Sequence, residues 1–78
     1  MAPRRPVHPT LAAFGRNVRK YREELDFSQE ILAEKADLDQ TYISGIERGL
    51  RNPGIKNVAR IAKALGITTS ELCVEVEA

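Results

Sequence analysis

The sequence predicts an all-α fold in which five helices surround a single hydrophobic core. Apolar residues recur every three or four positions through most of the chain, which is the period of an amphipathic helix. Residues that cap or stop helices separate these segments, and no stretch alternates between apolar and polar residues as a half-buried strand does. The 78 residues, of which 42% are hydrophobic and 29% charged, have the composition of one small folded domain.

The chain begins with a segment that is predicted to be a flexible tail. Residues 1–9 contain three prolines and two arginines, a composition that disfavours a helix. We therefore place the folded domain at residues 10–78, with Thr10 as the N-cap of a first helix. The single histidine, His8, is expected to be a solvated side chain of the tail. The apolar positions of the first helix are Leu11, Phe14, Val18, Tyr21 and Leu25.

Two short helices joined by a tight turn are predicted between Gln29 and Arg48. Ser28 is a suitable N-cap for the first helix, with Glu30 in its first turn, and Asp39 is a suitable N-cap for the second. The second helix has a buried stripe on one face and a stripe of small and polar residues on the other, whereas an idle surface helix usually carries Lys, Glu and Ala outward. The inward positions of the pair are Leu32, Ala33, Ala36, Leu38, Ile43 and Ile46, and the outward positions are Thr41, Ser44, Gly45 and Arg48.

Two further helices are predicted after a loop at residues 49–54. The fourth helix has one apolar face and stops at Gly66. Thr68 and Glu71 have the spacing of a capping box and therefore start a short fifth helix. The apolar face of the fourth helix consists of Ile55, Val58, Ile61, Ala62 and Leu65.

The helix pair resembles the DNA-binding motif of the phage-repressor-like helix-turn-helix proteins, also called the XRE type. In that family a Gln opens the first motif helix and the second helix enters the major groove, and Gln29 stands at the matching place. The segment TYISGIERGLRNP, residues 41–53, is similar to the restriction-modification controller proteins, which are small dimeric transcription regulators. One departure is Asp37, at a corner where the family usually has Gly, although Asp tolerates a left-handed conformation better than most residues. The resemblance covers roughly residues 14–72, and an ordinary helical hairpin is the alternative.

The charge of the chain is unevenly distributed. The net charge is only +1, which is lower than that of many nucleic-acid-binding domains. Residues 40–63 nevertheless contain five basic residues and one acidic residue, a local net charge of +4, while residues 71–78 contain three acidic residues and no basic one. This distribution predicts a basic region around the second motif helix and an acidic end that faces away from DNA. Ordinary solvated helices can show a similar asymmetry.

Three residues are candidates for reading the edges of bases. Gln40 opens the second motif helix, and its amide can pair with N6 and N7 of adenine. The resembled controllers commonly have Arg at this position, so Gln40 implies a different operator. Thr41 offers a hydroxyl group and a methyl group that suits thymine. By the resemblance, Arg51 reaches a base edge, or else a phosphate. The alternative for Gln40 and Thr41 is that both are solvated residues at the start of a helix.

Other polar residues of the motif are candidates for contacts to the DNA backbone. Gln29 begins the first motif helix, where its side-chain amide and its backbone N–H can both meet a phosphate at the positive helix end, although it is also a good first-turn residue. Gly45 would allow the helix backbone to approach DNA closely, unless it is only a weak point in the helix. Arg4 and Arg5 would reach a minor groove or a phosphate, or make no contact. The remaining phosphate candidates are Tyr42, which can instead pack on a core edge, and Ser44, Arg48, Asn52 and Lys56.

Two expectations concern structural roles. In the resembled phage repressors, a Glu at the position of Glu47 pairs with an Arg of the first helix, and Arg22 stands at the matching place. The resemblance therefore implies a partly buried structural salt bridge between Arg22 and Glu47. Cys73 is the only cysteine, and it is expected to be a small buried apolar group rather than a reactive or intermolecular thiol.

A homodimer on an inverted-repeat operator is expected, because a single reading helix touches too few base pairs to select one site. A two-fold dimer would read half-sites about 34 Å apart. The last two helices would form the dimer surface, although Val74 and Val76 can otherwise belong to a frayed end. The expected partners are double-stranded DNA, a second copy of the chain and, at the promoter, RNA polymerase. The candidate dimer residues are Ile67, Leu72, Val74 and Val76.

The expected function is therefore a sequence-specific transcription regulator, in the role of a controller of restriction-modification genes. A phage-type repressor or a DNA-binding antitoxin is the alternative within the same class, and a protein-interaction module without DNA binding is the alternative from another class. An enzyme has no support, because the chain has one His, one Cys, no glycine-rich phosphate loop and no paired carboxylates. No cofactor or metal is expected. The lack of an apolar stretch of about 20 residues and of a signal peptide predicts a cytoplasmic protein without a membrane partner.

Overall fold

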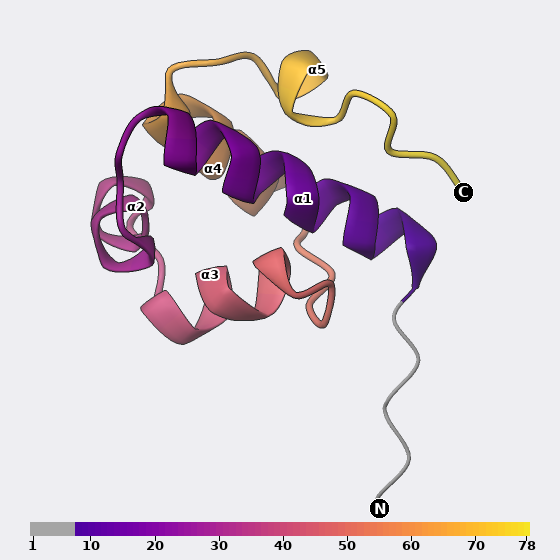
Figure 1. The fold of residues 1–78 in the computed structure, drawn as a ribbon, viewed down its shortest axis with the longest axis horizontal. Coiled ribbons are helices and arrows are strands. Elements are labelled where there is room, and N and C mark those ends of the chain that lie inside the picture. The colour runs from indigo at the N-terminus through magenta and orange to yellow at the C-terminus, as the bar shows by residue number, and fades with distance from the viewer. Residues whose placement is uncertain (1–7) are drawn as a thin grey trace, which may run out of the picture.

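Five α-helices make up the regular structure of residues 8–78, the part of the chain that the computed structural model describes (Figure 1). No residue in this range lies in a β-strand, so the prediction of an all-α fold is confirmed. The predictions for residues 1–7, including those for Arg4 and Arg5, lie outside the described residues. The helices are α1 (Pro9–Glu24), α2 (Gln29–Ala36), α3 (Gln40–Glu47), α4 (Ile55–Leu65) and α5 (Thr69–Leu72).

All five helices contribute residues to the hydrophobic core. α1 packs against α3, α4 and α5, while α2 packs against α3 and α4. In Figure 1, α3 and α5 lie on opposite sides of α1. None of the described helices combines the length and the apolar character that a membrane crossing requires. The buried core residues are Phe14, Val18, Leu32, Ala33, Ala36, Ile43, Ile46, Val58, Ile61, Ala62, Leu65 and Leu72.

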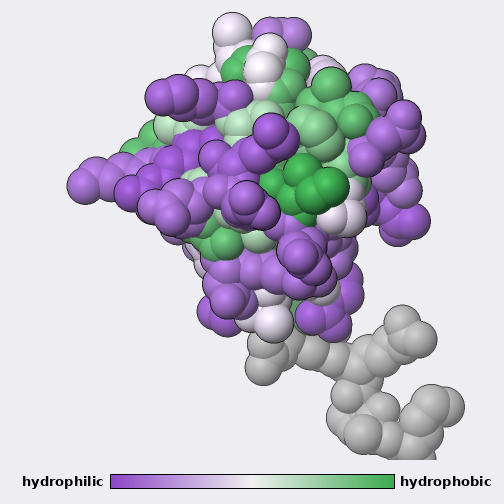
Figure 2. All heavy atoms as spheres, turned by 90° about the vertical axis from the view of Figure 1, so that its left-hand side faces the viewer, coloured by the Kyte–Doolittle hydropathy of each residue, from purple (hydrophilic) through white to green (hydrophobic). Residues whose placement is uncertain are grey.

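Two residues that were assigned to apolar helix faces are exposed instead. Leu25 follows the last residue of α1 and is 44% exposed, and Ile55 is the first residue of α4 and is 75% exposed. Both lie at helix ends, beyond the turns that pack on the core. Ile31 of α2 is also exposed. Figure 2 views the molecule from the side of α2 and shows hydrophobic areas between hydrophilic side chains.

The first helix begins at Pro9, two residues earlier than a cap at Thr10 would place it. The N-cap is His8, whose Nδ1 accepts a hydrogen bond from the backbone N–H of Thr10 at 3.2 Å. Pro9 suits the first helical position because the N–H group that it lacks would have no partner inside the helix. The assignment of Thr10 as the cap was therefore wrong. Its hydroxyl group instead donates a hydrogen bond to the backbone carbonyl of Glu77.

The other helix ends follow the local signals of the sequence. The Ser28 side chain accepts a hydrogen bond from the backbone N–H of Ile31 at 3.0 Å and caps α2. α4 ends at Gly66, whose φ of 72° lies in the left-handed region that glycine adopts easily. Thr68 and Glu71 form the predicted capping box at the start of α5. These predictions are confirmed.

The corner between α2 and α3 is closed by a residue in the left-handed conformation. Asp37 has φ 57° and ψ 47°, a conformation that most L-residues adopt only at a cost. Two residues later, the Asp39 carboxylate accepts a hydrogen bond from the backbone N–H of Thr41 at 2.9 Å and caps α3, as predicted. Hydrogen bonds from the side chain and then the backbone of Thr41 lower the pKa of Asp39. A negative cap at this place stabilises the positive end of α3.

The residues after α5 fold back along α1. The side-chain amide of Asn17 donates hydrogen bonds to the carbonyl oxygens of Leu72 at 2.8 Å and Val74 at 2.7 Å. Val76 packs against the core. Leu72 is fully buried within a single chain, which corrects its assignment to a dimer surface. Cys73 is exposed, which corrects the expectation of a buried thiol, because Leu72 takes the inward position at the end of α5.

Candidate nucleic-acid interface

α3 has one fully buried face and one accessible face. Ile43 and Ile46 are fully buried and fix the helix against the core. The opposite side is accessible at the first turn of the helix and again at the residue that follows it, so α3 is anchored on one side and exposed at both ends of the other. The accessible residues are Gln40, Thr41 and Arg48, which are exposed, and Ser44, which is half-buried.

The first turn of α3 carries the two residues that were predicted to read bases. The Thr41 hydroxyl group donates a hydrogen bond to the Asp39 carboxylate, so the hydroxyl proton already has a partner within the protein. The methyl group of Thr41 is then the part suited to a thymine methyl group. Gln40 carries an amide with both donor and acceptor atoms, which is the combination that a bidentate contact to adenine requires.

A largely buried ion pair ties the C-terminal end of α3 to α1. Arg22 Nε donates to Glu47 Oε2 at 2.6 Å, and Arg22 Nη2 donates to Glu47 Oε1 at 2.9 Å. The two side chains are 13% and 4% exposed, respectively. Arg22 Nη1 also donates to the carbonyl oxygen of Phe27 at 2.8 Å. The hydrogen bond to Glu47 raises the pKa of Arg22 against the opposing effect of burial, so the guanidinium stays charged.

Gln29 belongs to the same network. Its Nε2 donates to Glu47 Oε1 at 3.1 Å, which links the start of α2 to the end of α3. The side-chain amide of Gln29 was expected to face a phosphate, but its donor group faces Glu47. The backbone N–H groups at the start of α2 are therefore the better candidates for an anion contact.

Gly45 is not an open surface position. It is buried, and a Cβ atom built on it would lie 2.7 Å from Cγ of Arg51. This corrects the expectation that Gly45 lets the backbone approach DNA, because the stem of Arg51 fills the gap. The guanidinium carbon of Arg51 lies 5.6 Å from the centroid of the Tyr42 ring. The Tyr42 hydroxyl accepts a hydrogen bond from Asn57 Nδ2 at 3.2 Å.

Asn57 is a residue that sequence reasoning missed. It lies 15 positions after Tyr42, in the first turn of α4, and no local pattern connects the two side chains. Only the path of the loop between α3 and α4 brings them together.

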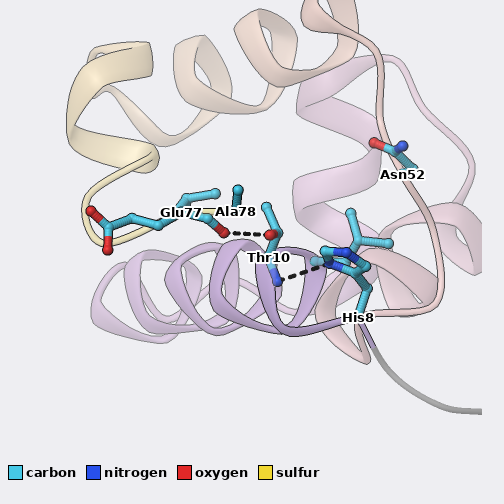
Figure 3. Close-up of a pocket in the computed structure, with 7 residues that line it drawn as sticks. His8, Thr10, Asn52, Glu77 and Ala78 are labelled. Atoms are coloured by element: carbon cyan, nitrogen blue, oxygen red, sulfur yellow. Dashed lines mark hydrogen bonds between the residues drawn. The ribbon is translucent and has the colours of Figure 1, made fainter.

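The remaining phosphate candidates lie between the end of α3 and the first turn of α4. Arg48, Asn52 and Lys56 are exposed, and Arg48 Nε lies 3.4 Å from the carbonyl oxygen of Ser44. Asn52 lines a shallow pocket between the loop, the start of α1 and the C-terminal residues (Figure 3). In that view it stands apart from the hydrogen bonds that join Thr10 to its neighbours.

The basic residues counted along residues 40–63 form two groups in the structure. Arg60 and Lys63 line a hollow between α2 and α4. The other three, Arg48, Arg51 and Lys56, lie at the end of α3, in the following loop and in the first turn of α4. Two of the five basic residues therefore belong to the hollow between α2 and α4.

An anchored α3 that follows a tight corner and keeps an accessible outer face is the arrangement of a helix-turn-helix protein. The helix-turn-helix family profile matches residues 18–72, and the chain belongs to this family. The protein is a helix-turn-helix transcription regulator similar to restriction-modification controller proteins.

The similar proteins include control proteins from several bacteria. Control protein C.MunI of Mycoplasma sp is 48% identical over 65 residues, which cover 82% of this chain and 88% of that protein. Control protein C.BamHI of Bacillus amyloliquefaciens is 48% identical over 60 residues, which cover 76% of this chain and 74% of that protein. The crystal structure of the restriction-modification controller protein C.AhdI from Aeromonas hydrophila matches with a TM-score of 0.82 and 40% identity, covering 83% of this chain and 98% of that chain.

Proposed function

We propose that the protein is the controller of a restriction-modification system and acts as a homodimer on an inverted-repeat operator near a promoter. Its similarity to control proteins over most of the chain supports this role. The observation that carries the proposal is the geometry of α3, which exposes Gln40 and Thr41 at its leading turn while its opposite face is fully buried. A helix held in this way can enter a major groove about 12 Å wide.

Base reading and phosphate binding fall on different residues in this proposal. Gln40 pairs with adenine, Thr41 contacts a thymine methyl group and Arg51 contacts a base edge. Contacts to the DNA backbone fix the register, and each cation among them displaces counterions. The residues that make these backbone contacts are Gln29, through its main chain, and Tyr42, Ser44, Arg48, Asn52 and Lys56.

The dimer surface in this proposal lies on the side of α5. Val74 is 54% exposed, and Ile67 and Val76 are half-buried. Because α5 and α3 lie on opposite sides of α1, a partner that packs against the side of α5 leaves α3 accessible (Figure 1). The two copies of α3 then occupy half-sites about 34 Å apart. A dimer bound near a promoter would also meet RNA polymerase.

Footprinting on the DNA upstream of its own gene tests the proposal. We expect two protected half-sites related by two-fold symmetry and about one helical turn apart. Sedimentation of the complex should show two copies of the chain per operator. An unrelated duplex of the same length is the control, because phosphate contacts alone bind every sequence. Equal affinity for both duplexes at moderate ionic strength would contradict the proposal, and a single chain on the operator would contradict the dimer.

A further inference from the structure

The Arg51 side chain is held against α3 by a set of neighbouring groups. Gly45 and Tyr42 are three residues apart on α3 and therefore adjacent on its surface. The missing side chain of Gly45 leaves the space that the Arg51 stem occupies, since a Cβ atom there would lie 2.7 Å from Arg51 Cγ. The guanidinium carbon of Arg51 lies 5.6 Å from the centroid of the Tyr42 ring, within the range of a cation–π interaction. The hydrogen bond from Asn57 to the Tyr42 hydroxyl restrains that ring in turn.

The backbone after α3 turns back so that Arg51 can reach this place. Gly49 has φ 73°, and its N–H donates to the carbonyl of Ile46 at 3.0 Å. The N–H of Leu50 donates to the carbonyl of Gly45 at 2.8 Å. These two hydrogen bonds form a Schellman motif, which fixes the direction of the chain just before Arg51.

We propose that Gly45, Tyr42 and Asn57 are positioning residues that hold Arg51 in the orientation in which it reads a base edge beside α3. The inference rests on the proposed function, in which Arg51 contacts DNA. An exposed arginine in a loop loses much rotamer freedom when it binds, and holding it in place beforehand removes part of that loss.

The role of Tyr42 is then carried by its ring rather than only by its hydroxyl group. The hydroxyl oxygen accepts a hydrogen bond from Asn57, and its own proton remains available to a phosphate. The Arg51 guanidinium group lies over the face of the Tyr42 ring. Gly45, which presents no group of its own to DNA, contributes by leaving room for the arginine stem.

A double-mutant cycle on DNA binding tests this proposal. The probe is a duplex that the wild-type protein selects from a randomised pool, together with all its single-base-pair variants. Arg51→Ala is expected to lower the affinity per half-site roughly 5- to 150-fold and to relax the preference at the base pair that Arg51 reads. Gly45→Ala and Tyr42→Leu are each expected to relax the same base pair. In the Arg51→Ala background, neither should cause a further relaxation, because the side chain that they displace is gone.

Gly54→Ala is the matched control, because it makes the same chemical change in the loop after Arg51 at a place where a new Cβ atom meets nothing within 4 Å. It should leave the base preference unchanged. If Gly45→Ala reduced the base preference equally with and without Arg51, the proposal would be overturned, because the new methyl group would then act on DNA or on the fold directly. An unchanged base preference in Arg51→Ala would also overturn it, although selection of a duplex by the wild-type protein would still support the proposed function.

A measurement without DNA separates the two proposals. In the free protein, NMR should show a nuclear Overhauser contact between the α protons of Gly45 and the γ protons of Arg51. Tyr42→Leu should weaken this contact. Its absence in the wild-type protein would overturn the positioning role whatever the protein binds. If instead the contact is present and no duplex is selected, the proposed function fails, and with it the reading role of Arg51.

Discussion

Replacing Glu47 with Gln is expected to lower the free energy of unfolding by about 3 kcal/mol. The substitution keeps the shape of the side chain but removes its charge, so the largely buried guanidinium of Arg22 loses its paired anion. Glu47 accepts hydrogen bonds from both Arg22 and Gln29. Because only one of the two terminal atoms of an amide is an acceptor, the new side chain would direct its NH₂ group at one of these donors.

The magnitude follows from burial. Removing one partner of a buried ion pair costs about 3–5 kcal/mol, because the other charge is left unpaired. We take the lower end, since Gln retains one acceptor and the Arg22 side chain keeps 13% of its exposure. Urea unfolding followed by far-ultraviolet circular dichroism measures the loss, provided that the urea dependence has the same slope in both proteins. If the variant is partly unfolded in buffer, both proteins are compared in the same concentration of a stabilising osmolyte.

The ion pair between Arg19 and Glu23 is the matched control. Its two side chains are 64% and 55% exposed, so Glu23→Gln should cost less than about 0.5 kcal/mol. The double variant Arg22→Met, Glu47→Leu should lose less free energy of unfolding than Glu47→Gln alone, because it leaves no charge unpaired. The reasoning would be refuted if Glu47→Gln cost no more than Glu23→Gln, or if the double variant were less stable than the single one.

Four further predictions concern reading, affinity and the ends of the motif helices. Gln40→Ala should remove about 1–3 kcal/mol of discrimination at one base pair per half-site, measured with single-base-pair operator variants, and an equal loss for all duplexes would contradict a reading role. Arg48→Ala should weaken binding to all DNA sequences equally and reduce the slope of log affinity against log salt by about one per protomer. An unchanged slope in salt titrations would exclude a phosphate contact. The pKa of Asp39 is lowered in the folded protein, so its charged form stabilises the fold above the ordinary Asp pKa of about 3.9, and this contribution is lost as the pH falls through the lowered value. In thermal unfolding, the stability advantage of the wild-type protein over Asp39→Asn should therefore shrink as the pH falls below about 4, whereas a pH-independent difference would contradict the lowered pKa. Asp37→Gly should raise the free energy of unfolding by about 0.5–1 kcal/mol, because glycine adopts the left-handed conformation without a Cβ clash, and a loss of stability would contradict this.

Helix ends and helix faces could be predicted from the sequence because both depend on nearby residues. The N-cap at Ser28, the stop at Gly66 and the capping box that begins at Thr68 each involve groups within four positions of one another. The start of α1 was missed because two local signals competed there. Thr10 is a suitable N-cap residue, but Pro9, which was assigned to the tail, is equally compatible with the first helical position.

The errors at Gly45 and Leu72 have a different cause. Whether Gly45 is open or covered depends on Arg51, which returns from the loop, and the burial of Leu72 depends on how α5 packs against the rest of the core. Such contacts join residues that are distant in sequence or that meet only through the path of a loop. A helical period shows that a position faces outward from its own helix, but it does not show what other segment covers that position.

The two ends of α3 are fixed by different interactions, and these interactions affect both the stability of the fold and the binding of α3 to DNA. An isolated helix of eight residues is unstable in water, so α3 depends on its surroundings. At its start the Asp39 carboxylate caps the first turn, and at its end Glu47 is tied to both α1 and α2. A helix that is already ordered loses less conformational entropy when it binds DNA. Variants of Glu47 should therefore lower DNA affinity in proportion to the folded protein that they lose, while the order of base preference set by Gln40 stays the same.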